Sequence, residues 1–442
     1  MILHAVAAFL LAQEGPVLQV PEGFVVEPVA APPLVERPIM ACFDDRGRLY
    51  VCESSGRNVK NEEMKARPEY TLRRLEDADG DGVFDRSVIF ARGLTMPAGA
   101  AWVRGSLFVA SPPDLLRFED TNHDGVADVK EIVVTGWNLS SNAASLHGPI
   151  LGPDGWLYLT DGRHGFDIRT RDGRHYKGRA SRIWRVRPDG TGLESFAGGG
   201  FDNPIEVVFT GGGEVIGTMT YFTDPKEGLR DALLHFVEGG VYPKWFSVVG
   251  EFKRTGDLMP VMTRLARIAP SGLERKRSAA WGPAWQGNLF SAQFNPHKVQ
   301  RHILHREGAT FRTSDEDFLT SLDPEFHPTD VVEDADGSLL VIDTGAWFLH
   351  GCPLSRISKP QIRGGIYRVR KTDAAPVADP RGNRLAGNAP LDSIAARLDD
   401  PRPSVRDRAL DALVEAGDAA TALLAHAAAR GNRLAGNAPL NS

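Results

Sequence analysis

The hydrophobic positions of the chain fall in short runs, and each run follows a turn that contains glycine. Two examples are "GPDGWLYLTDG" (152–162) and "DADGSLLVIDTG" (334–345). Polar turn residues followed by a run of aromatic and branched residues are typical of a β-strand after a tight turn. The pattern occurs six times, with turn glycines at Gly47, Gly105, Gly155, Gly213, Gly287 and Gly337. An internal repeat of this length indicates a repeated supersecondary unit.

A second apolar strand precedes most of these turns and often begins just after a proline, as in "NPIEVVF" and "HPTDVVE". "ASRIWRVRPDG" and "GGIYRVRK" predict further, outer strands. Four strands in each of six radial units predict a mainly β protein, a six-bladed β-propeller, over residues 22–371. "EGFVVEPVA" (22–30) is expected to complete the last blade and close the ring. The alternative is a β-sandwich with accidental similarity between its hairpins.

The composition changes after Lys371. Residues 372–390 are rich in Pro, Ala and Gly and predict a linker. Residues 391–430 have helical periodicity, with Val405, Ala409 and Leu413 on one face. "DDPRPSVRDRALDAL" resembles the turn and second helix of a HEAT repeat. Such a repeat needs neighbours to bury its face, so residues 431–442 are interpreted as a tail and the chain as a candidate fragment of a longer protein.

The charge and the N-terminus bear on location and partners. The net charge is −6 and no basic stripe is present, so nucleic acid is not an expected partner. "MILHAVAAFLLAQEG" contains a short apolar run, which predicts a signal peptide over residues 1–12 and export to the periplasm or the extracellular space. The run is too short for a transmembrane helix, and no other segment is long enough.

The three cysteines, Cys42, Cys52 and Cys352, lack the paired spacing of a structural zinc site. Cys42 and Cys52 lie on the two arms of a predicted hairpin. We interpret them as buried free thiols, and a disulfide between them is the alternative.

Two acidic loops have the composition of calcium sites. "DADGDGVFD" (77–85) and "DTNHDGVADVKE" (120–131) place oxygen-bearing side chains on alternate residues before a glycine, which suits a cation that prefers oxygen ligands. The flanking segments are predicted to be strands, so we expect hairpin loops and not helix pairs. A polar turn without metal is the alternative. The expected ligands are Asp77, Asp79, Asp81, the carbonyl of Val83 and Asp85 in the first loop, and Asp120, Asn122, Asp124, the carbonyl of Val126, Asp128 and Glu131 in the second.

Three segments carry a resemblance to a known family. They are "HGPILGPDGWLYLTDG", "DNPIEVVFTGGGEVIGT" and "FHPTDVVEDADGSLLVIDTG … GGIYRVR". They resemble large exported proteins of planctomycetes and their relatives, often labelled membrane-bound dehydrogenases. That family joins a glucose/sorbosone-dehydrogenase-like propeller to HEAT repeats and often to a c-type cytochrome. The haem motif C-x-x-C-H is absent here, so a cytochrome acceptor would lie on another chain or in a missing segment.

The better-studied relatives are aldose dehydrogenases that use pyrroloquinoline quinone and calcium. The resemblance implies that His147 is the general base and that Asp161 orients it. In the relatives the Arg of an "RNP" segment lies near the quinone, so Asn203 and, as the nearest arginine in the sequence, Arg163 are the candidates for quinone binding here. Where relatives carry "RNP", this chain has Asp202-Asn203-Pro204. The alternative for His147 is a structural histidine that lines the propeller channel.

Three function classes follow from these observations. The first is an exported, calcium-supported, quinone-dependent sugar or alcohol dehydrogenase. The second is a non-catalytic propeller that binds a ligand or a protein, with the HEAT-like segment as an interaction arm. The third is a lactonase-type hydrolase, for which Asn203, Glu206 and Asp330 are candidate channel residues. Fold similarity alone does not choose among them.

Overall fold

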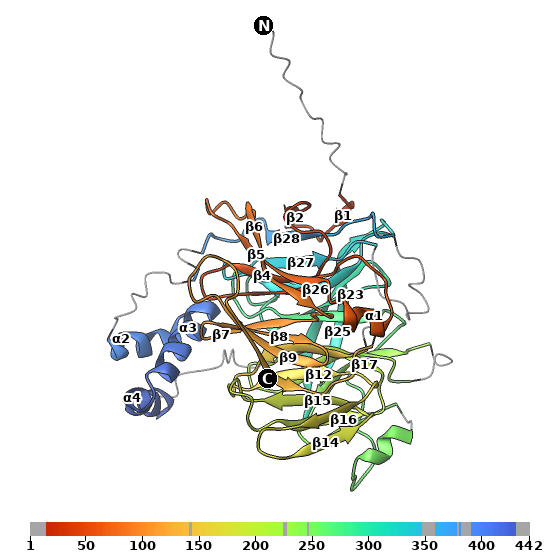
Figure 1. The fold of residues 1–442 in the computed structure, drawn as a ribbon. Helices are drawn as coiled ribbons and strands as arrows, with labels where there is room; N and C mark the ends of the chain where they lie inside the picture. The colour runs from red at the N-terminus through yellow and green to blue at the C-terminus, as the bar shows by residue number, and fades with distance from the viewer. Residues whose placement is uncertain are drawn as a thin grey trace.

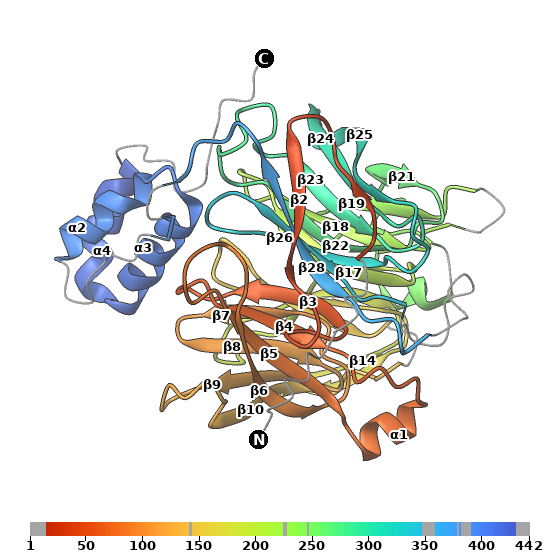
Figure 2. The same cartoon turned by 90° about the horizontal axis from the view of Figure 1, so that it is seen from above.

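The computed structural model describes residues 15–140, 144–223, 228–244, 247–346, 359–377, 380–381 and 390–429. Six sheets are arranged around one axis, and each supplies one blade (Figures 1 and 2). The first strands of neighbouring blades contact one another around the whole ring. The predicted six-bladed β-propeller is therefore confirmed.

The blades follow the chain in order. Blade 1 contains β3 (Pro38–Phe43), β4 (Leu49–Glu53), β5 (Tyr70–Glu76) and β6 (Arg86–Leu94). Blade 2 contains β7 (Ala100–Val103), β8 (Ser106–Ser111), β9 (Asp114–Glu119) and β10 (Val129–Thr135). Blade 3 contains β11 (Leu146–Leu151), β12 (Leu157–Asp161), β15 (Ser181–Val186), β16 (Glu194–Gly199) and the short parallel β20 (Val241–Tyr242).

The second half of the ring is built in the same way. Blade 4 contains β17 (Asn203–Phe209), β18 (Val215–Thr220), β19 (Asp231–Phe236) and β21 (Thr263–Leu265). Blade 5 contains β22 (Pro270–Arg275), β23 (Leu289–Gln293), β24 (Lys298–Glu307), β25 (Thr310–Ser321) and β1 (Leu18–Gln19). Blade 6 contains β26 (Pro328–Glu333), β27 (Leu339–Asp343), β28 (Gly365–Lys371) and β2 (Phe24–Ala30). Outside the blades lie the hairpin β13 (Phe166–Arg169) and β14 (His175–Gly178), helix α1 (Asn61–Ala66) and the 3-10 helix η2 (Ser247–Glu251).

The N-terminal strand β2 closes the ring, as the sequence predicted. It pairs antiparallel with β28, with Phe24 opposite Lys371. The Phe24 ring packs edge-on against Trp281, Trp285 and Phe318, at centroid distances of 4.9, 4.7 and 5.3 Å. Because those three side chains belong to blade 5, Phe24 ties the start of the chain to two blades at once.

The repeated turn glycines have a conformational cause. Each joins the first strand of a blade to the second, and each has a φ between 78° and 87°. Only glycine adopts this left-handed region without a steric penalty. These turns lie together on one face of the propeller, which we call the far face. The opposite end, where the first strands begin and the second strands end, is called the mouth.

A β-bulge interrupts the pairing of the first two strands in blades 1, 3, 4, 5 and 6. A bulge leaves residues of one strand without a partner and re-aims their side chains. In blade 4 the unpaired residues include Glu206, and in blade 6 the register shifts just before Asp330. The bulges therefore set the direction of side chains near the propeller axis.

The C-terminal segment folds into a small helical unit beside the propeller (Figures 1 and 2). Its elements are α2 (Leu391–Ala395), the 3-10 helix η3 (Ala396–Asp399), α3 (Pro403–Glu415) and α4 (Asp418–Ala429). Ala395, Leu398, Ala409 and Leu413 form its own apolar core. The predicted helices are confirmed, and their assignment to HEAT repeats stays a prediction. No helix among the described residues is both long and apolar enough to cross a membrane.

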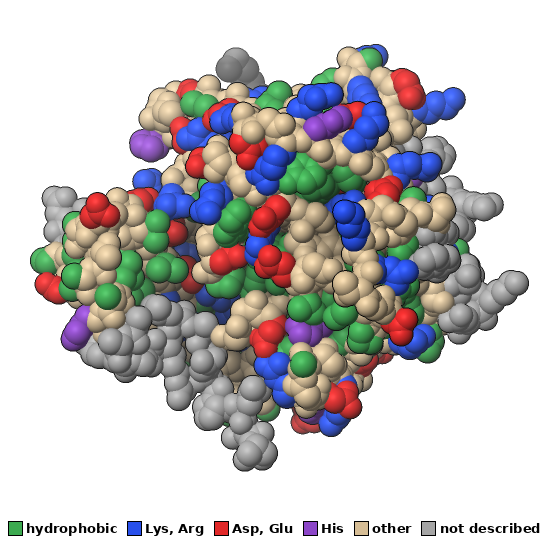
Figure 3. Space-filling view, turned by 90° about the horizontal axis from the view of Figure 1, so that it is seen from below, with side chains coloured by type: hydrophobic (Ala, Val, Ile, Leu, Met, Phe, Trp, Pro, Cys, Tyr) green, Lys and Arg blue, Asp and Glu red, His purple; other side chains and the backbone are tan. Residues whose placement is uncertain are grey.

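On the side drawn in Figure 3, acidic and basic side chains are interspersed and neither sign predominates. Cys42 on β3 and Cys52 on β4 are free thiols, while Cys352 lies outside the described residues. The predicted signal peptide also lies outside them.

Candidate functional site at the mouth of the channel

His147 lies at the mouth end of β11, where it pairs in register with Thr160. Its side chain is buried, with 3% of the residue exposed. Burial lowers the pKa of His147 to about 4, although the backbone of Ser145 favours the charged form. The imidazole is therefore neutral at pH 7. Its Nδ1 has no hydrogen-bond partner among the described residues, which leaves a buried acceptor or donor open to a ligand.

Asp161 does not orient His147 in this structure. It pairs in register with Leu146, next to His147, and adjacent strand residues point to opposite faces of a sheet. The Thr160 hydroxyl, on the face of His147, donates to the carbonyls of Pro204 and Ile205 in blade 4, at 3.0 and 2.8 Å. Asp161 instead accepts from the indole Nε1 of Trp184 at 3.4 Å, inside the core between blades 2 and 3. Burial raises the pKa of Asp161 well above its usual range.

The repeat explains the placement of Asp161. Glu53 and Asp343 end the second strands of blades 1 and 6 at the same position. Asp343 accepts from the backbone N–H of His327 at 2.8 Å, just before the first strand of its blade. Glu53 receives the N–H of Arg37, also just before a first strand, at 3.3 Å. An acidic residue at this position therefore shapes the blade in at least two of its copies.

The two cofactor-binding candidates from the sequence lie at the junction of blades 3 and 4. Asn203 begins β17, and its Oδ1 is buried without a partner among the described residues. Arg163 follows β12, and its guanidinium donates to Asp202 Oδ1 from Nε at 3.2 Å and Nη2 at 2.9 Å. The side chains of this pair are 27% and 29% exposed. Asp202, which stands where the relatives have an arginine, therefore binds the guanidinium of Arg163.

Several unpartnered buried polar atoms belong to residues at the mouth ends of the blades. Besides His147 Nδ1 and Asn203 Oδ1 they include Gln293 Oε1 at the end of β23 and Thr344 Oγ1 just after β27. These four atoms come from four consecutive blades, 3 to 6. Because nearly all buried polar groups in folded proteins are hydrogen-bonded, such a group marks a place for water or a polar ligand.

Below the mouth, two carboxyl groups meet near the axis. Glu206 of β17 and Asp330 of β26 are hydrogen-bonded to each other. Glu206 accepts from the N–H of Leu273 at 2.7 Å, and Asp330 accepts from the N–H of Ala41 at 2.8 Å. Each carboxyl group thus also binds the first strand of the next blade.

A glycine makes room for this pair. A Cβ atom on Gly272, in the intervening blade 5, would lie 2.4 Å from Asp330 Oδ1. Burial and the neighbouring carboxyl raise the pKa of Glu206 well above its usual range, and burial raises that of Asp330 to about 8. The pair therefore carries at least one proton at neutral pH. The sequence offered both residues as candidates. Each comes two residues after a proline near the start of a first strand, Pro204 or Pro328, and the β-bulge that begins at this proline sets the direction of its side chain.

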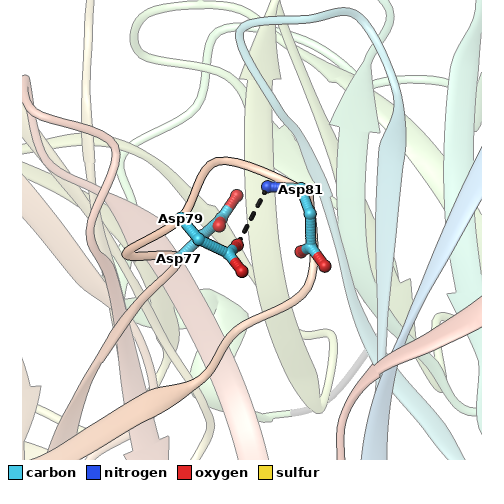
Figure 4. A group of neighbouring side chains, drawn as sticks. All are labelled: Asp77, Asp79 and Asp81. Carbon is cyan, nitrogen blue, oxygen red and sulfur yellow. Dashed lines mark hydrogen bonds between the residues drawn. The ribbon is translucent and has the colours of Figure 1, made fainter.

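The first acidic loop brings three carboxylates together. One oxygen of each of Asp77, Asp79 and Asp81 lies within 4.8 Å of the others, as Figure 4 shows. Backbone N–H groups of Gly80 and Gly82 donate to Asp77, which fixes the loop conformation. Asp85 instead accepts from the N–H of Ala78 at 3.3 Å. The loop lies near a shallow hollow lined by Arg46, Arg48, Glu76 and Asp77, away from the mouth.

The second acidic loop is arranged differently. Asp120 forms an ion pair with Arg74 at 3.1 Å, so a cation of the protein already neutralises the first expected ligand. Glu131, the expected bidentate ligand, instead pairs with Arg117 at 3.0 Å and Arg171 at 3.1 Å. Asn122, Asp124 and Asp128 hydrogen-bond to one another and to the loop backbone. The loop with the fuller sequence pattern is thus the one with fewer available oxygens.

Sugar-dehydrogenase propellers are among the solved structures most similar in fold. An oxidoreductase described as a glucose dehydrogenase from Thermus thermophilus has a TM-score of 0.54 and 18% identity, over 78% of this chain and 100% of its own. The PQQ-bound aldose sugar dehydrogenase from Streptomyces coelicolor has a TM-score of 0.54 and 16% identity, over 80% of this chain and 100% of its own. A calcium structure of an AA12-family enzyme from Trichoderma reesei has a TM-score of 0.54 and 11% identity, over 80% of this chain and 97% of its own.

At these identities the likeness shows the fold and no more. No curated protein matches the chain. Residues 13–373 match the family described as a domain of unknown function (DUF7133), and the chain belongs to this family.

Proposed function

We propose that the propeller oxidises a hydroxyl group of a sugar or alcohol at its mouth, with a bound quinone as the electron acceptor. The observation that carries the proposal is the group of buried, unpartnered polar atoms at the mouth, above all His147 Nδ1 and Asn203 Oδ1. A ligand with several hydroxyl groups can satisfy such atoms, because each hydroxyl both donates and accepts. The fold shared with a PQQ-bound sugar dehydrogenase supports the same interpretation.

His147 has the protonation state that a general base requires. A neutral imidazole has one acceptor nitrogen, and a ligand hydroxyl that donates to Nδ1 selects the tautomer with that nitrogen free. The substrate O–H proton then moves to Nδ1 as the C–H bond gives up its electron pair as hydride. A pKa of about 4 makes His147 a weak base in the free protein. An anionic group bound beside it would stabilise the imidazolium and raise that pKa.

Pyrroloquinoline quinone fits the mouth if Arg163 exchanges its partner. When bound, the quinone accepts the hydride from the substrate. Arg163 would hold a quinone carboxylate, and the unpartnered Asn203 would contact its polar edge. The side chains of Arg163 and Asp202 are each more than a quarter exposed to solvent. Ion pairs at such positions contribute only about 0–1 kcal/mol to the free energy of folding. Exchanging Asp202 for a ligand carboxylate therefore costs little, although the charge of Asp202 remains close.

Calcium belongs to the proposal as a structural ion on the far side of blade 1. The loop 77–85 would hold it through Asp77, Asp79 and Asp81, whose oxygens already lie together. The carbonyl of Val83 and Asp85 would complete the site after a small movement of Asp85. We do not extend the proposal to the loop 120–131, because Arg74 neutralises Asp120 there.

A second candidate, a binding propeller without catalysis, is favoured by two observations. His147 has no orienting carboxylate at Asp161, and the cation Arg163 is already paired. The hydrolase alternative receives less support, since Glu206 and Asp330 bind each other and backbone N–H groups. Carboxyl groups held in this way are not free to activate water. Export and a separate cytochrome acceptor remain proposals that follow from the first candidate.

The experiment is dye reduction with a panel of sugars and alcohols after adding quinone and calcium. Replacing a general base costs about 100- to 10,000-fold in rate, so His147→Ala should lose that much. His305→Ala, on β24 in blade 5, is the matched control and should keep full activity. Activity that survives His147→Ala removes this residue from the mechanism. Sugar binding without any dye reduction supports the binding propeller.

A direct binding measurement tests the quinone site separately. Titration of the protein with quinone should give tighter binding for Asp202→Asn and weaker binding for Arg163→Met, by several-fold each. The first change removes the competing carboxylate and the second removes the cation. Equal affinities in all three proteins would place the quinone elsewhere or nowhere on this chain.

A further inference from the structure

The C-terminal helical unit lies against the far face of the propeller, opposite the mouth. Arg277, in the turn that follows β22 of blade 5, donates to both carboxylate oxygens of Asp407 on α3, at 2.7 and 2.8 Å. Arg408 of α3 donates to the carbonyl of Arg381 at 2.8 Å. Arg381 in turn pairs with Asp334 in the far-face turn of blade 6. The helical unit therefore contacts the turn of blade 5 directly and the turn of blade 6 through Arg381.

The same contacts extend to blades 1 and 2. Arg381 packs against Gly47, the turn glycine of blade 1, so closely that a Cβ atom there would lie 2.2 Å from its Nε. Asp411 lies one helical turn beyond Asp407. Burial raises the pKa of Asp411 to about 6, while the nearby charge of Arg104, in the far-face turn of blade 2, lowers it and that of Asp45 of blade 1 raises it further. Helix α3 thus contacts blade 5 directly, reaches blades 6 and 1 through Arg381, and lies near Arg104 of blade 2.

In a ring of six blades, blades 5 and 2 are opposite each other. A helix that pairs with Arg277 of blade 5 and lies near Arg104 of blade 2 lies over the axis between them. Its acidic residues Asp407, Asp411 and Glu415 recur every four positions and so lie along one face of α3. The propeller turns that they approach carry Arg277 and Arg104. The two surfaces are complementary in charge as well as in position.

We propose that α3 is a cap over the far end of the axial channel, held by its acidic face against the arginines of the far-face turns. With the far end covered, ligands and solvent reach the channel carboxyls Glu206 and Asp330 through the mouth. The Arg277–Asp407 pair is 41% and 51% exposed. Exposed pairs are weak and are screened by salt, so the cap can open without unfolding of the propeller.

The reactivity of the Cys42 thiol can report whether this cap is closed. It stands next to the far-face end of β3 and is partly exposed. Burial raises the pKa of its thiol well above the usual range, the nearby charge of Asp330 in blade 6 adds to that shift, and the backbone of Trp102 in blade 2 donates to it. Cys42 is therefore close to the channel between three blades. The rate at which N-ethylmaleimide modifies Cys42, measured peptide by peptide with mass spectrometry, reports access from the far face.

The test uses the full chain and a charge swap. Arg277→Asp and Asp407→Arg should each speed the modification of Cys42 by about three- to tenfold, the effect of replacing a weak attraction with a repulsion. The double variant Arg277→Asp/Asp407→Arg should return the rate towards that of the unchanged chain. Asp418, at the start of α4, forms no hydrogen bond or ion pair with the propeller among the described residues, so Asp418→Arg is the matched charge control and should change nothing.

Three results would overturn the proposal. One is a modification rate for Cys42 in the unchanged chain that equals the rate in the urea-unfolded chain. Another is an equal rate in all four variants while small-angle scattering shows that the helical unit has moved away. The third is a double variant as fast as the single ones, because charge complementarity would then not hold the cap. High salt should also speed the modification in the unchanged chain, and an unchanged rate counts against the proposal.

Discussion

Replacing Glu206 by Gln should change how the stability of the propeller depends on pH. Glu206 and Asp330 both keep their protons in the folded state at neutral pH, because burial raises both pKa values, whereas in the unfolded chain both groups titrate near their ordinary pKa values of about 4. Asp330 keeps its own proton in Glu206→Gln, so the variant differs from the unchanged protein by the proton of Glu206. Between about pH 4 and pH 8 the folded protein therefore binds more protons than the unfolded chain. Stability from this source is complete below pH 4 and is lost as the pH rises through the folded pKa, which is about 8 for Asp330.

The magnitude follows from linkage. Each retained proton lowers the free energy of unfolding by about 1.4 kcal/mol for every unit of pH between pH 5 and pH 7. Gln keeps an acceptor for the N–H of Leu273, which Glu206 now binds at 2.7 Å, and can donate to Asp330. It does not titrate. The free energy of unfolding of the unchanged protein should thus fall by about 3 kcal/mol relative to Glu206→Gln between pH 5 and pH 7.

The assay is urea unfolding followed by tryptophan fluorescence at several pH values. Glu307→Gln, an exposed change in the β24–β25 hairpin, serves as the control and should give a pH profile parallel to that of the unchanged protein. The reasoning fails if the difference between Glu206→Gln and the unchanged protein is the same at pH 5 and pH 7. That result would mean that Glu206 carries no proton in the folded state between pH 5 and pH 7.

Two further predictions concern closure of the ring and the acidic loops. Phe24→Ala should lower the free energy of unfolding by about 3–5 kcal/mol, since it removes a ring that packs on three aromatic side chains, and Val25→Ala on the exposed side of the same strand should change it by about 0.5 kcal/mol or less. Equal effects in chemical unfolding would show that the packing of Phe24 does not close the ring. A calcium chelator should lower the melting temperature, because an ion that binds only the folded state stabilises it. Asp81→Asn should abolish this shift, and Asp124→Asn, at the matching position of the second loop, should leave it intact; the reverse result would reassign the site.

The repeat made the fold predictable from the sequence. A glycine in the left-handed region is needed once per blade, so Gly47 and its five counterparts mark the blades at regular intervals. The apolar strand "FVVEPVA" has no partner nearby in the sequence, and the open outer position of blade 6 is the place that a propeller leaves for it. Local periodicity and the need to close the ring were therefore sufficient. The contact of α3 with the far face was not predictable, since it rests on long-range ion pairs such as Arg277–Asp407.

The candidate site was predictable only in part. The type of residue at His147 indicated proton transfer, and the structure leaves its Nδ1 open. The partner Asp161 was expected from its position after the strand, but alternation along β12 turns it to the other face of the blade. Likewise, spacing favoured the loop 120–131 for calcium, while Arg74 reaches Asp120 from a neighbouring blade. The register of β12 with β11 decided the first case, and the sequence around Asp161 does not give that register. A contact between blades decided the second, and a pattern within one segment carries no information about it.

A comparison of equivalent positions in the blades separates residues that build the fold from residues that serve a function. Six positions after the turn glycine, the repeat has Glu53, Asp161 and Asp343, so an acidic residue recurs there. Eight positions before it, His147 stands where blades 1, 4 and 6 have Ile39, Ile205 and Thr329. A side chain that recurs is explained by the blade, and one that departs from the repeat needs another explanation. Burial keeps His147 uncharged and leaves its Nδ1 without a hydrogen-bond partner among the described residues, and both effects lower the stability of the folded protein. The architecture of the blade does not explain this loss of stability. That cost is the physical reason to assign His147, and not Asp161, to the chemistry at the mouth.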